Sequence, residues 1–320
     1  MNALDQLRKM TIIVEDTGDI QAIKKHRPRD ATTNPSLLLT AAQLPEYKYI
    51  IDDAVLHCKK KCDPASSWQP CLERLSIKFA EEILDVISGR VSVEIDSTLS
   101  FHTKKTIETA RRIIKQFEND GYERSRILIK IASTWEGIKA AEILEKEGIH
   151  CNMTLLFSFA QAVACAEAKV RLISPFVGRI LDWHKALLGV ENIPASEDPG
   201  VHSVIKIYNY YKKFGYKTEI MGASFRNTEE IIELAGCDLL TISPKLLDEL
   251  EKLEGRLERK LSPENAAKLE MKRISLDESA FRWMLNENAM ATEKLAEGIR
   301  KFSADLSNLA GYMRQGPCPK

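Results

Sequence analysis

The sequence predicts a parallel (β/α)8 barrel (a TIM barrel of the α/β class), and three observations support that prediction. Eight short apolar runs recur along the chain, and helical periodicity follows them. Each run ends in a polar residue or carries one inside it. A doubly wound open sheet would also bury parallel strands, but no glycine-rich phosphate loop follows the first run. Eight strand–helix units therefore favour closure into a barrel.

The predicted strands alternate with predicted helices in chain order. Apolar and β-branched residues dominate the strands, as expected for a parallel sheet covered by helices. The strands are expected at residues 11–14, 30–32, 91–96, 127–132, 151–157, 170–176, 219–225 and 239–243. Helical patterns between them include residues 103–119, 135–147, 201–214 and 228–235. Residues 1–320 are therefore expected to form a single barrel domain.

The chain is longer than a minimal barrel of about 250 residues. Two regions are expected to hold the surplus as extra helices. The first lies between the second and third strands, at residues 47–61 and 72–87, and the second follows Pro244, at residues 277–286 and 290–309. The tail, residues 311–320, is expected to be disordered.

Composition excludes several function classes. Lys and Arg total 46, as do Asp and Glu, so no net charge favours nucleic acid or an anionic membrane. The N-terminus has no apolar core of a signal peptide, and no apolar run is long enough to span a bilayer. The seven cysteines are odd in number and lack paired C-x-x-C units or a histidine at ligand spacing. We expect reduced cysteines, no metal site and a cytoplasmic protein.

Lys130 interrupts the fourth predicted strand, which is otherwise wholly apolar. Burial disfavours the charged form of an amine, which is how a lysine becomes a nucleophile towards a carbonyl. A strand-end lysine can instead extend its ammonium group into water. This segment alone does not decide between the two interpretations.

The other predicted strand ends help to decide, because the carboxyl ends of barrel strands form the active-site mouth. A lysine that shares this mouth with carboxylates, amides, hydroxyls and guanidinium groups has the surroundings of a catalytic group. The polar residues expected there are Asp16, Asn34, Glu94, Lys130, Asn152, Thr154, Ser174, Arg179, Ser224 and Arg226.

Five segments closely resemble the transaldolase family. They are ATTNPSL at residues 31–37, ILIKIASTW at 127–135, NMTLLFS at 152–158, ISPFVGR at 173–179 and MGASFR at 221–226. The resemblance runs from about Leu7 to Leu309 and is greatest to the longer bacterial and eukaryotic-type enzymes, whose C-terminal helix packs beside the active site. Ser97-Thr98 depart from the Ala-Arg common after the third strand, which affects only local packing.

The resemblance implies transfer of a dihydroxyacetone unit between sugar phosphates in the pentose phosphate pathway, without a metal or organic cofactor. Sedoheptulose 7-phosphate or fructose 6-phosphate would be the donor, and glyceraldehyde 3-phosphate or erythrose 4-phosphate the acceptor. Lys130 would form a Schiff base with the donor, and the resulting iminium would accept electrons from the broken C–C bond. A homodimer is also expected from the resemblance.

Three further side chains would then handle protons and water. Glu94 would shuttle protons during Schiff-base formation, although a salt bridge to Lys130 or Arg126 is its structural alternative. Asp16 would be the base for cleavage, and capping of the following helix is its alternative. Thr154 would help to order the water.

The remaining matched positions would bind the substrate. Asn, Thr and Ser at strand ends are most often turn or capping residues, so only their convergence with Lys130 favours a site. Two arginines on neighbouring strand ends suit a dianionic phosphate better than a solvated surface. The dihydroxyacetone unit would be bound by Asn34, Asn152, Ser174 and Phe176. Behind these residues would lie Thr32 and Ser133. The phosphate would be bound by Arg179, Ser224 and Arg226.

Three other functions can be weighed against this one. Fructose 6-phosphate aldolase, a shorter relative, uses the same Schiff base, but the C-terminal extension, Glu94 and Phe176 (a tyrosine in that enzyme) argue against it. A non-catalytic sugar-phosphate-binding barrel would not need Lys130, Glu94 and Asp16 together. A glycosidase with paired carboxylates would leave Lys130 unexplained.

Overall fold

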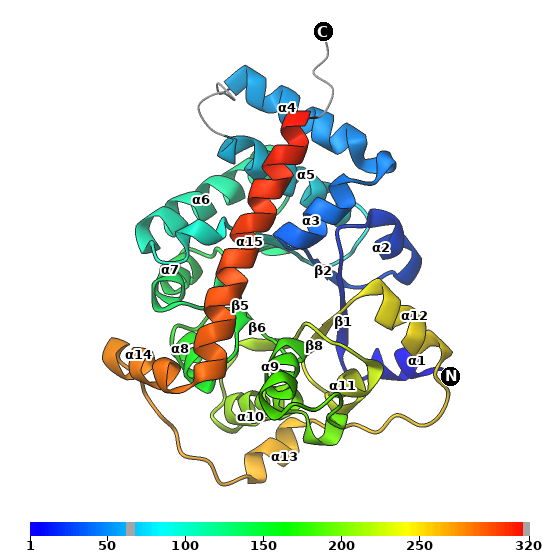
Figure 1. The fold of residues 1–320 in the computed structure, drawn as a ribbon, viewed down its shortest axis with the longest axis vertical. Coiled ribbons are helices and arrows are strands. Elements are labelled where there is room, and N and C mark those ends of the chain that lie inside the picture. The colour runs from blue at the N-terminus through cyan, green and yellow to red at the C-terminus, as the bar shows by residue number, and fades with distance from the viewer. Residues whose placement is uncertain (62–67, 316–320) are drawn as a thin grey trace.

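Eight parallel strands close into a barrel, which confirms the predicted fold class (Figure 1). The computed structural model describes residues 1–61 and 68–315. Each strand pairs with the next in the chain, and β1 pairs with β8. The strands are β1 Ile12–Asp16, β2 Asp30–Thr32, β3 Val91–Glu94, β4 Ile127–Ala132, β5 Cys151–Leu156, β6 Leu172–Pro175, β7 Glu219–Gly222 and β8 Leu239–Ile242.

Five strands are shorter than their apolar runs suggest, and β3, β6 and β7 differ by two or more residues. β3 ends at Glu94 rather than at residue 96, because Asp96 accepts a hydrogen bond from Thr98 N (2.8 Å) and begins the 3-10 turn η2, Ser97–Leu99. β6 begins and ends within its run, and β7 ends within its run. Beyond their carboxyl ends, an isolated bridge between Phe176 and Ala223 continues the pairing. Apolar sequence alone does not set where a strand stops pairing.

Helices surround the barrel on all sides (Figure 1). Those that follow the strands are α2 Ile20–His26, α3 Pro35–Ala42, α6 Thr103–Asn119, α7 Trp135–Lys146, α8 Phe159–Glu167, α9 Gly178–Leu188, α10 Pro199–Lys213, α11 Thr228–Glu233 and α12 Pro244–Lys252. The others are α1 Ala3–Leu7, α4 Lys48–Lys61, α5 Gln69–Leu84, α13 Pro263–Lys268, α14 Glu278–Glu287 and α15 Ala289–Gln315. The predicted extra helices are therefore present in both surplus regions.

The last helix, α15, lies across the barrel rather than around it (Figure 1). It contacts α3, β5 and α9. A Cβ atom on Gly298 would lie 2.6 Å from Leu155 Cδ2, so this glycine permits the close approach to β5. The expectation of a disordered tail from residue 311 is wrong for residues 311–315, which continue α15. Residues 316–320 lie outside the described residues.

One cysteine expectation is also wrong. Cys58 in α4 and Cys71 in α5 form a disulfide, with their Cα atoms 5.4 Å apart, because the two helices pack against each other. Cys151, Cys165 and Cys237 are free and buried, as expected of reduced thiols. Cys62 and Cys318 lie outside the residues whose side chains are described.

Alternation along β4 explains how an apolar strand presents a lysine to the barrel interior. Ile127, Ile129 and Ile131 belong to the core between the strands and the helices. Leu128 belongs instead to a small interior cluster with Val14, Leu172, Met221 and Leu239. Since successive side chains point to opposite faces, Lys130 lies on the same interior face as Leu128, further along towards the carboxyl end of the strand.

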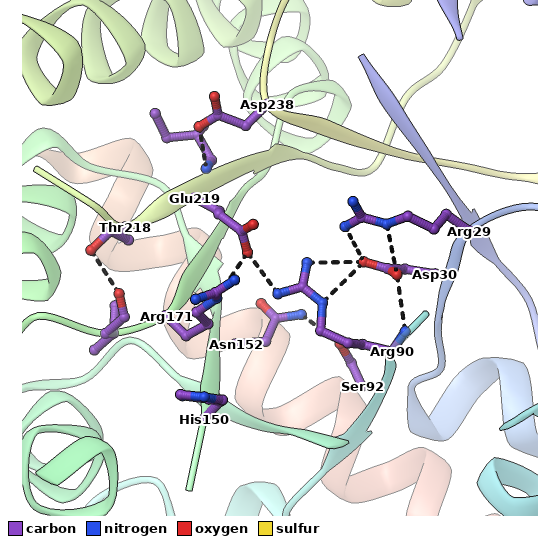
Figure 2. Close-up of polar contacts among 12 residues, drawn as sticks. Arg29, Asp30, Arg90, Ser92, His150, Asn152, Arg171, Thr218, Glu219 and Asp238 are labelled. Carbon is purple, nitrogen blue, oxygen red and sulfur yellow. Dashed lines mark hydrogen bonds and ion pairs between the residues drawn. The ribbon is translucent and has the colours of Figure 1, made fainter. Parts of the chain in front are cut away.

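The opposite end of the barrel is closed by charged side chains (Figure 2). Arg90 bridges Asp30 at 2.9 Å and Glu219 at 2.7 Å, and its side chain is mostly buried. Arg29 and Arg171 add bonds to the same two carboxylates. Burial would raise the pKa of Asp30, but the two arginines outweigh it and hold that pKa below its usual value. This network stabilises the amino ends of β2 and β7, away from the polar mouth.

Candidate active site

A cavity of about 170 Å³ opens among the carboxyl ends of the strands. Most of the residues predicted from the sequence line it, although they come from distant segments. The lining consists of Asp16, Thr32, Asn34, Lys130, Thr154, Ser174, Phe176, Arg179, Met221, Ala223, Ser224, Phe225, Arg226, Thr241, Ser243 and Phe302.

Lys130 lies in this cavity with its side chain 6 % exposed, so it does not extend into bulk water. Its Nζ donates to the Thr33 carbonyl at 3.0 Å. Glu94 Oε2 lies 3.1 Å from the same nitrogen, within ion-pair distance. This carboxylate oxygen has no well-aligned hydrogen bond to any described residue. Its contact with Lys130 is therefore an ion pair and not a well-formed hydrogen bond. Strand register explains the approach, because Glu94 pairs with Lys130 between β3 and β4.

Two buried carboxyl groups lie near the amine. Burial raises the pKa of Glu94 above its ordinary value, and the neighbouring Lys130 only partly offsets this. Burial likewise raises the pKa of Asp16, again offset in part by Lys130. Asp16 Oδ1 accepts from Thr32 Oγ1 at 2.8 Å, and Thr32 meets Thr241 at 2.8 Å. Raised pKa values suit groups that must take up and return protons near neutral pH.

Both structural alternatives for these carboxylates can now be judged. The side chain that caps α2 is Asp19, not Asp16, since Asp19 accepts from Gln21 N and Ala22 N. Arg126 binds the backbone carbonyls of Gly89, Leu84 and Ile87 and leaves Glu94 to Lys130. The other structural alternative for Glu94, a salt bridge to Lys130, is present at 3.1 Å. Asp16 lines the cavity, whereas Glu94 is not among the lining residues and acts on the cavity through Lys130.

The two asparagines differ in their positions. Asn34 lines the cavity and also caps α3, with its Oδ1 accepting from Leu37 N at 2.9 Å, which leaves its amide nitrogen as a donor. Asn152 pairs with Lys130 in the strand register but is not among the lining residues. Its Nδ2 donates to Ser92 Oγ at 3.0 Å (Figure 2). Its Oδ1 accepts from Ser174 Oγ at 2.5 Å. Asn152 thus positions the Ser174 side chain from outside the cavity lining.

Thr154 and Ser133 also differ. Thr154 lines the cavity, and its buried Oγ1 has no partner among the described residues, so this hydroxyl is available to a bound molecule. Ser133 is fully buried outside the lining, and its Oγ donates to the Thr154 carbonyl at 2.8 Å. A register shift in β5 between Met153 and Leu156, with Leu155 at φ 52°, lies beside this contact. Ser133 therefore acts on the strand that carries Thr154 and does not contact the cavity.

The far end of the cavity carries two arginines in different states. Arg179 lies over the rings of Phe176 (5.0 Å) and Phe302 (5.6 Å). Its buried Nη1 has no hydrogen-bond partner within residues 1–61 and 68–315. Burial lowers the pKa of Arg179, and the nearby positive charge of Arg226 lowers it further. An unpartnered, desolvated guanidinium group is the arrangement that an anion would satisfy.

Arg226 is more exposed, and its guanidinium group already pairs with Asp182 of α9 at 2.6 Å. Ser224, two residues earlier, adopts a left-handed backbone conformation with φ 64°. Its carbonyl accepts from Gly178 N at 2.8 Å, which joins the turn after β7 to the turn after β6. This contact brings both arginines to one end of the cavity.

Residues 13–313 match the family described as "Transaldolase/Fructose-6-phosphate aldolase". The chain belongs to this family.

Curated relatives in the family are similar over most of their length. The transaldolase of Acidobacterium capsulatum is 60 % identical over 310 residues, which cover 96 % of this chain and 93 % of the relative. Transaldolase B of Pasteurella multocida is 58 % identical and covers 97 % and 98 % respectively. The transaldolase of Thermosynechococcus vestitus is 57 % identical and covers 98 % and 82 %.

Sequence reasoning missed several lining residues of this family member. Thr241 and Ser243 are polar residues of the eighth predicted strand run, so the strand-end argument could have included them. Met221, Ala223 and Phe225 lie in a recognised segment but carry no polar group that would single them out. Phe302 reaches the cavity from α15, and only tertiary packing shows this.

The described residues offer neither a metal-ion cluster nor a membrane-spanning helix. No group of three or more His, Cys, Asp or Glu side chains among them could hold a metal ion. Within the same ranges, no helix is long and apolar enough to cross a membrane.

Proposed function

We propose that the protein is a transaldolase, which moves a dihydroxyacetone unit from a ketose phosphate to an aldose phosphate. The observation that carries the proposal is the buried contact of 3.1 Å between Lys130 Nζ and Glu94 Oε2, together with Arg179 and Arg226 in the same cavity lining as Lys130. An amine nucleophile, a proton carrier and an anion site are the three parts that this reaction needs.

The first steps join the donor to the protein. Glu94, whose pKa burial raises, takes the proton that the Lys130 ammonium must lose. The neutral amine attacks the C2 carbonyl of fructose 6-phosphate or sedoheptulose 7-phosphate to give a carbinolamine. Glu94 then returns a proton, through a water that Thr154 helps to order, to the departing hydroxyl. The protonated hydroxyl leaves as a water molecule, and an iminium remains on Lys130.

Cleavage follows from the iminium. Asp16 removes the proton from the C4 hydroxyl, the C3–C4 bond breaks, and its electron pair moves into the iminium to form an enamine. The released aldehyde is glyceraldehyde 3-phosphate or erythrose 4-phosphate, according to the donor. A second aldehyde then enters, and the same steps run in reverse. The iminium is the electron sink, so this sequence of steps uses neither a metal nor an organic cofactor.

Binding positions can be assigned along the cavity. Asn34 and Ser174, with Asn152 behind Ser174, hold the hydroxyls of the dihydroxyacetone unit, and Thr32 orients Asp16. Phe176 covers the enamine with an apolar ring. Arg179, Ser224 and Arg226 bind the phosphate of the donor or acceptor.

Trapping of the Schiff base tests the proposal. Borohydride reduction in the presence of fructose 6-phosphate should add one dihydroxyacetone-derived adduct, which peptide mapping should place on Lys130. Lys130→Met should retain the fold by circular dichroism and lose both the adduct and transfer to erythrose 4-phosphate. An adduct on another lysine, or transfer by the variant, would refute the mechanism.

Assembly and location are further parts of the proposal. We infer a homodimer that acts in the cytoplasm, and the support for both is the similarity to the family. Light scattering coupled to size-exclusion chromatography would report the mass in solution, and a mass of one chain at micromolar concentration would contradict the dimer.

A further inference from the structure

Two buried carboxyl groups lie behind the phosphate-binding end of the cavity, and the proposed reaction does not use them. Asp198 and Glu230 each have an exposed fraction of 0 %. Asp198 immediately precedes α10, whereas Glu230 lies in α11. Their side chains are within hydrogen-bonding reach of each other. The two carboxyl groups thus connect two helices that follow different parts of the barrel.

One oxygen of each carboxyl group is bound to backbone amides. Asp198 Oδ1 accepts from Gly200 N at 2.6 Å and from Val201 N at 3.4 Å. Glu230 Oε2 accepts from Arg226 N at 2.7 Å. The remaining oxygens, Asp198 Oδ2 and Glu230 Oε1, find no donor anywhere in the described chain. Two facing acceptors can bond only if one of them carries a proton.

Burial indicates which group carries that proton. It raises the pKa of Glu230 to about 7, and the facing Asp198 adds to the effect. Burial also raises the pKa of Asp198, although backbone amides and Glu230 lower it in part. Two adjacent buried carboxylates rarely ionise together, so a protonated Glu230 that donates to an ionised Asp198 accounts for both groups.

Backbone packing connects this pair to the phosphate-binding arginines. A Cβ atom on Gly200 would lie 2.3 Å from the Val177 carbonyl oxygen, and one on Gly178 would lie 2.5 Å from the Ser224 carbonyl oxygen. The start of α10, the turn after β6 and the turn after β7 therefore touch backbone to backbone. A shift of the carboxyl pair would be transmitted to Arg226, whose amide Glu230 holds.

We propose that Asp198 and Glu230 are a positioning pair, which holds the turn of Arg226 in its phosphate-binding conformation through one shared proton. The inference rests on the proposed function. When the shared proton is lost, the two carboxylates repel each other, the turn shifts, and the KM for a phosphorylated donor rises. The value of kcat changes little, because the contacts of Lys130 are with the Thr33 carbonyl and Glu94 and involve neither member of the pair.

The charged groups that act on the pair from outside it, Arg226 and His202, are both solvent-exposed. Arg226 faces Glu230 from its own turn and pairs with Asp182 of α9. His202 of α10 acts on Asp198 and bonds to the Ser196 carbonyl at 2.8 Å. Glu197, in the 3-10 turn η4 (Ala195–Glu197), is exposed. Solvent screens such groups, so the strongest electrostatic coupling is that between the two buried carboxyls.

Glu230→Gln tests the shared proton directly. The amide keeps an oxygen for Arg226 N and a permanent donor for Asp198, so it mimics the protonated pair at every pH. Asp198→Asn likewise supplies a permanent donor from the other side. Glu229→Gln is the matched control, because Glu229 is the exposed neighbour in the same helix and the change is chemically identical.

The assay is the KM for fructose 6-phosphate, measured from about pH 6.5 to 8.5 at saturating erythrose 4-phosphate, with kcat recorded separately. For the native protein and Glu229→Gln, we expect KM to rise about twofold to tenfold across this range, as for loss of one hydrogen bond. The KM of Glu230→Gln and Asp198→Asn should stay level. The substrate phosphate ionises alike in all four assays, so its titration cancels.

A second measurement does not depend on activity. An acid whose folded pKa is raised binds its proton more tightly on folding, so its stabilisation is complete below its ordinary pKa and is lost as the pH rises. The free energy of unfolding of the native protein should therefore fall relative to that of Glu230→Gln between pH 4.5 and about 7.

The outcomes separate the two proposals. A rise of KM in Glu230→Gln equal to that in Glu229→Gln, or an unfolding free energy with the same pH dependence in the native protein and in Glu230→Gln, would overturn the positioning pair. Absence of transfer by the native protein would instead overturn the proposed function, while the unfolding measurement would still decide whether the proton is shared.

Discussion

Replacement of Arg179 by methionine should weaken phosphate binding more than any other change at the far end of the cavity. Its buried Nη1 has no partner among the described residues, so a bound phosphate would supply one. A hydrogen bond to a charged group contributes about 1.5–3 kcal/mol, which corresponds to a KM for fructose 6-phosphate about tenfold to 150-fold higher. Arg226 already pairs with Asp182 and is more exposed, so we expect a smaller effect from Arg226→Met.

The same change should not unfold the protein. Arg179 gains cation–π contacts of about 0.5–1 kcal/mol with each of two rings, and methionine can retain much of the apolar contact. Burial and the charge of Arg226 lower the pKa of Arg179, which means that folding disfavours the charged form. Loss of the charge therefore offsets part of the loss of contact, and urea denaturation should show a change of less than about 2 kcal/mol.

The assay compares two donors with the same variant. KM for fructose 6-phosphate and for dihydroxyacetone, which has no phosphate, would be measured with Arg179→Met, Arg179→Lys and the native protein. We expect a large loss with the first donor only, and partial recovery in Arg179→Lys, which keeps the charge without the planar fork. Equal losses with both donors would show that Arg179 maintains the cavity shape and does not bind the phosphate.

The remaining predictions concern the proton carrier, the enamine and the disulfide. Glu94→Gln should lower kcat about 10²-fold to 10⁴-fold and slow borohydride trapping on Lys130, and an unchanged trapping rate would exclude the proton shuttle. Phe176→Tyr, which adds a phenolic donor beside the enamine, should raise release of free dihydroxyacetone relative to transfer. An unchanged ratio of release to transfer, with only lower stability, would make Phe176 a packing residue. Reduction of the disulfide between Cys58 and Cys71 should lower the free energy of unfolding by up to about 3 kcal/mol. The free energy of unfolding of Cys58→Ser should not change with dithiothreitol. Equal changes in the variant and the native protein would contradict this prediction.

The sequence by itself determined the fold class and most of the cavity. Eight apolar runs with polar ends can be satisfied by a closed parallel sheet whose carboxyl ends converge. The sequence alone therefore predicts that Lys130, Asp16, Thr154 and Arg179 lie together, as they do in the cavity lining. The physical reason is local. Alternation along a strand decides which side chains face inward, and the end of a run decides which of them reach the mouth.

Tertiary structure decided what local pattern does not encode. The disulfide, the shared proton of Asp198 and Glu230, and the approach of Phe302 to Arg179 all depend on how separate helices pack. The separation of Asn152 from the cavity depends on its bonds to Ser92 and Ser174, which arrive from other strands. Burial and hydrogen-bond partners are properties of the assembled chain, and they decide whether a polar residue contacts the cavity or supports one that does.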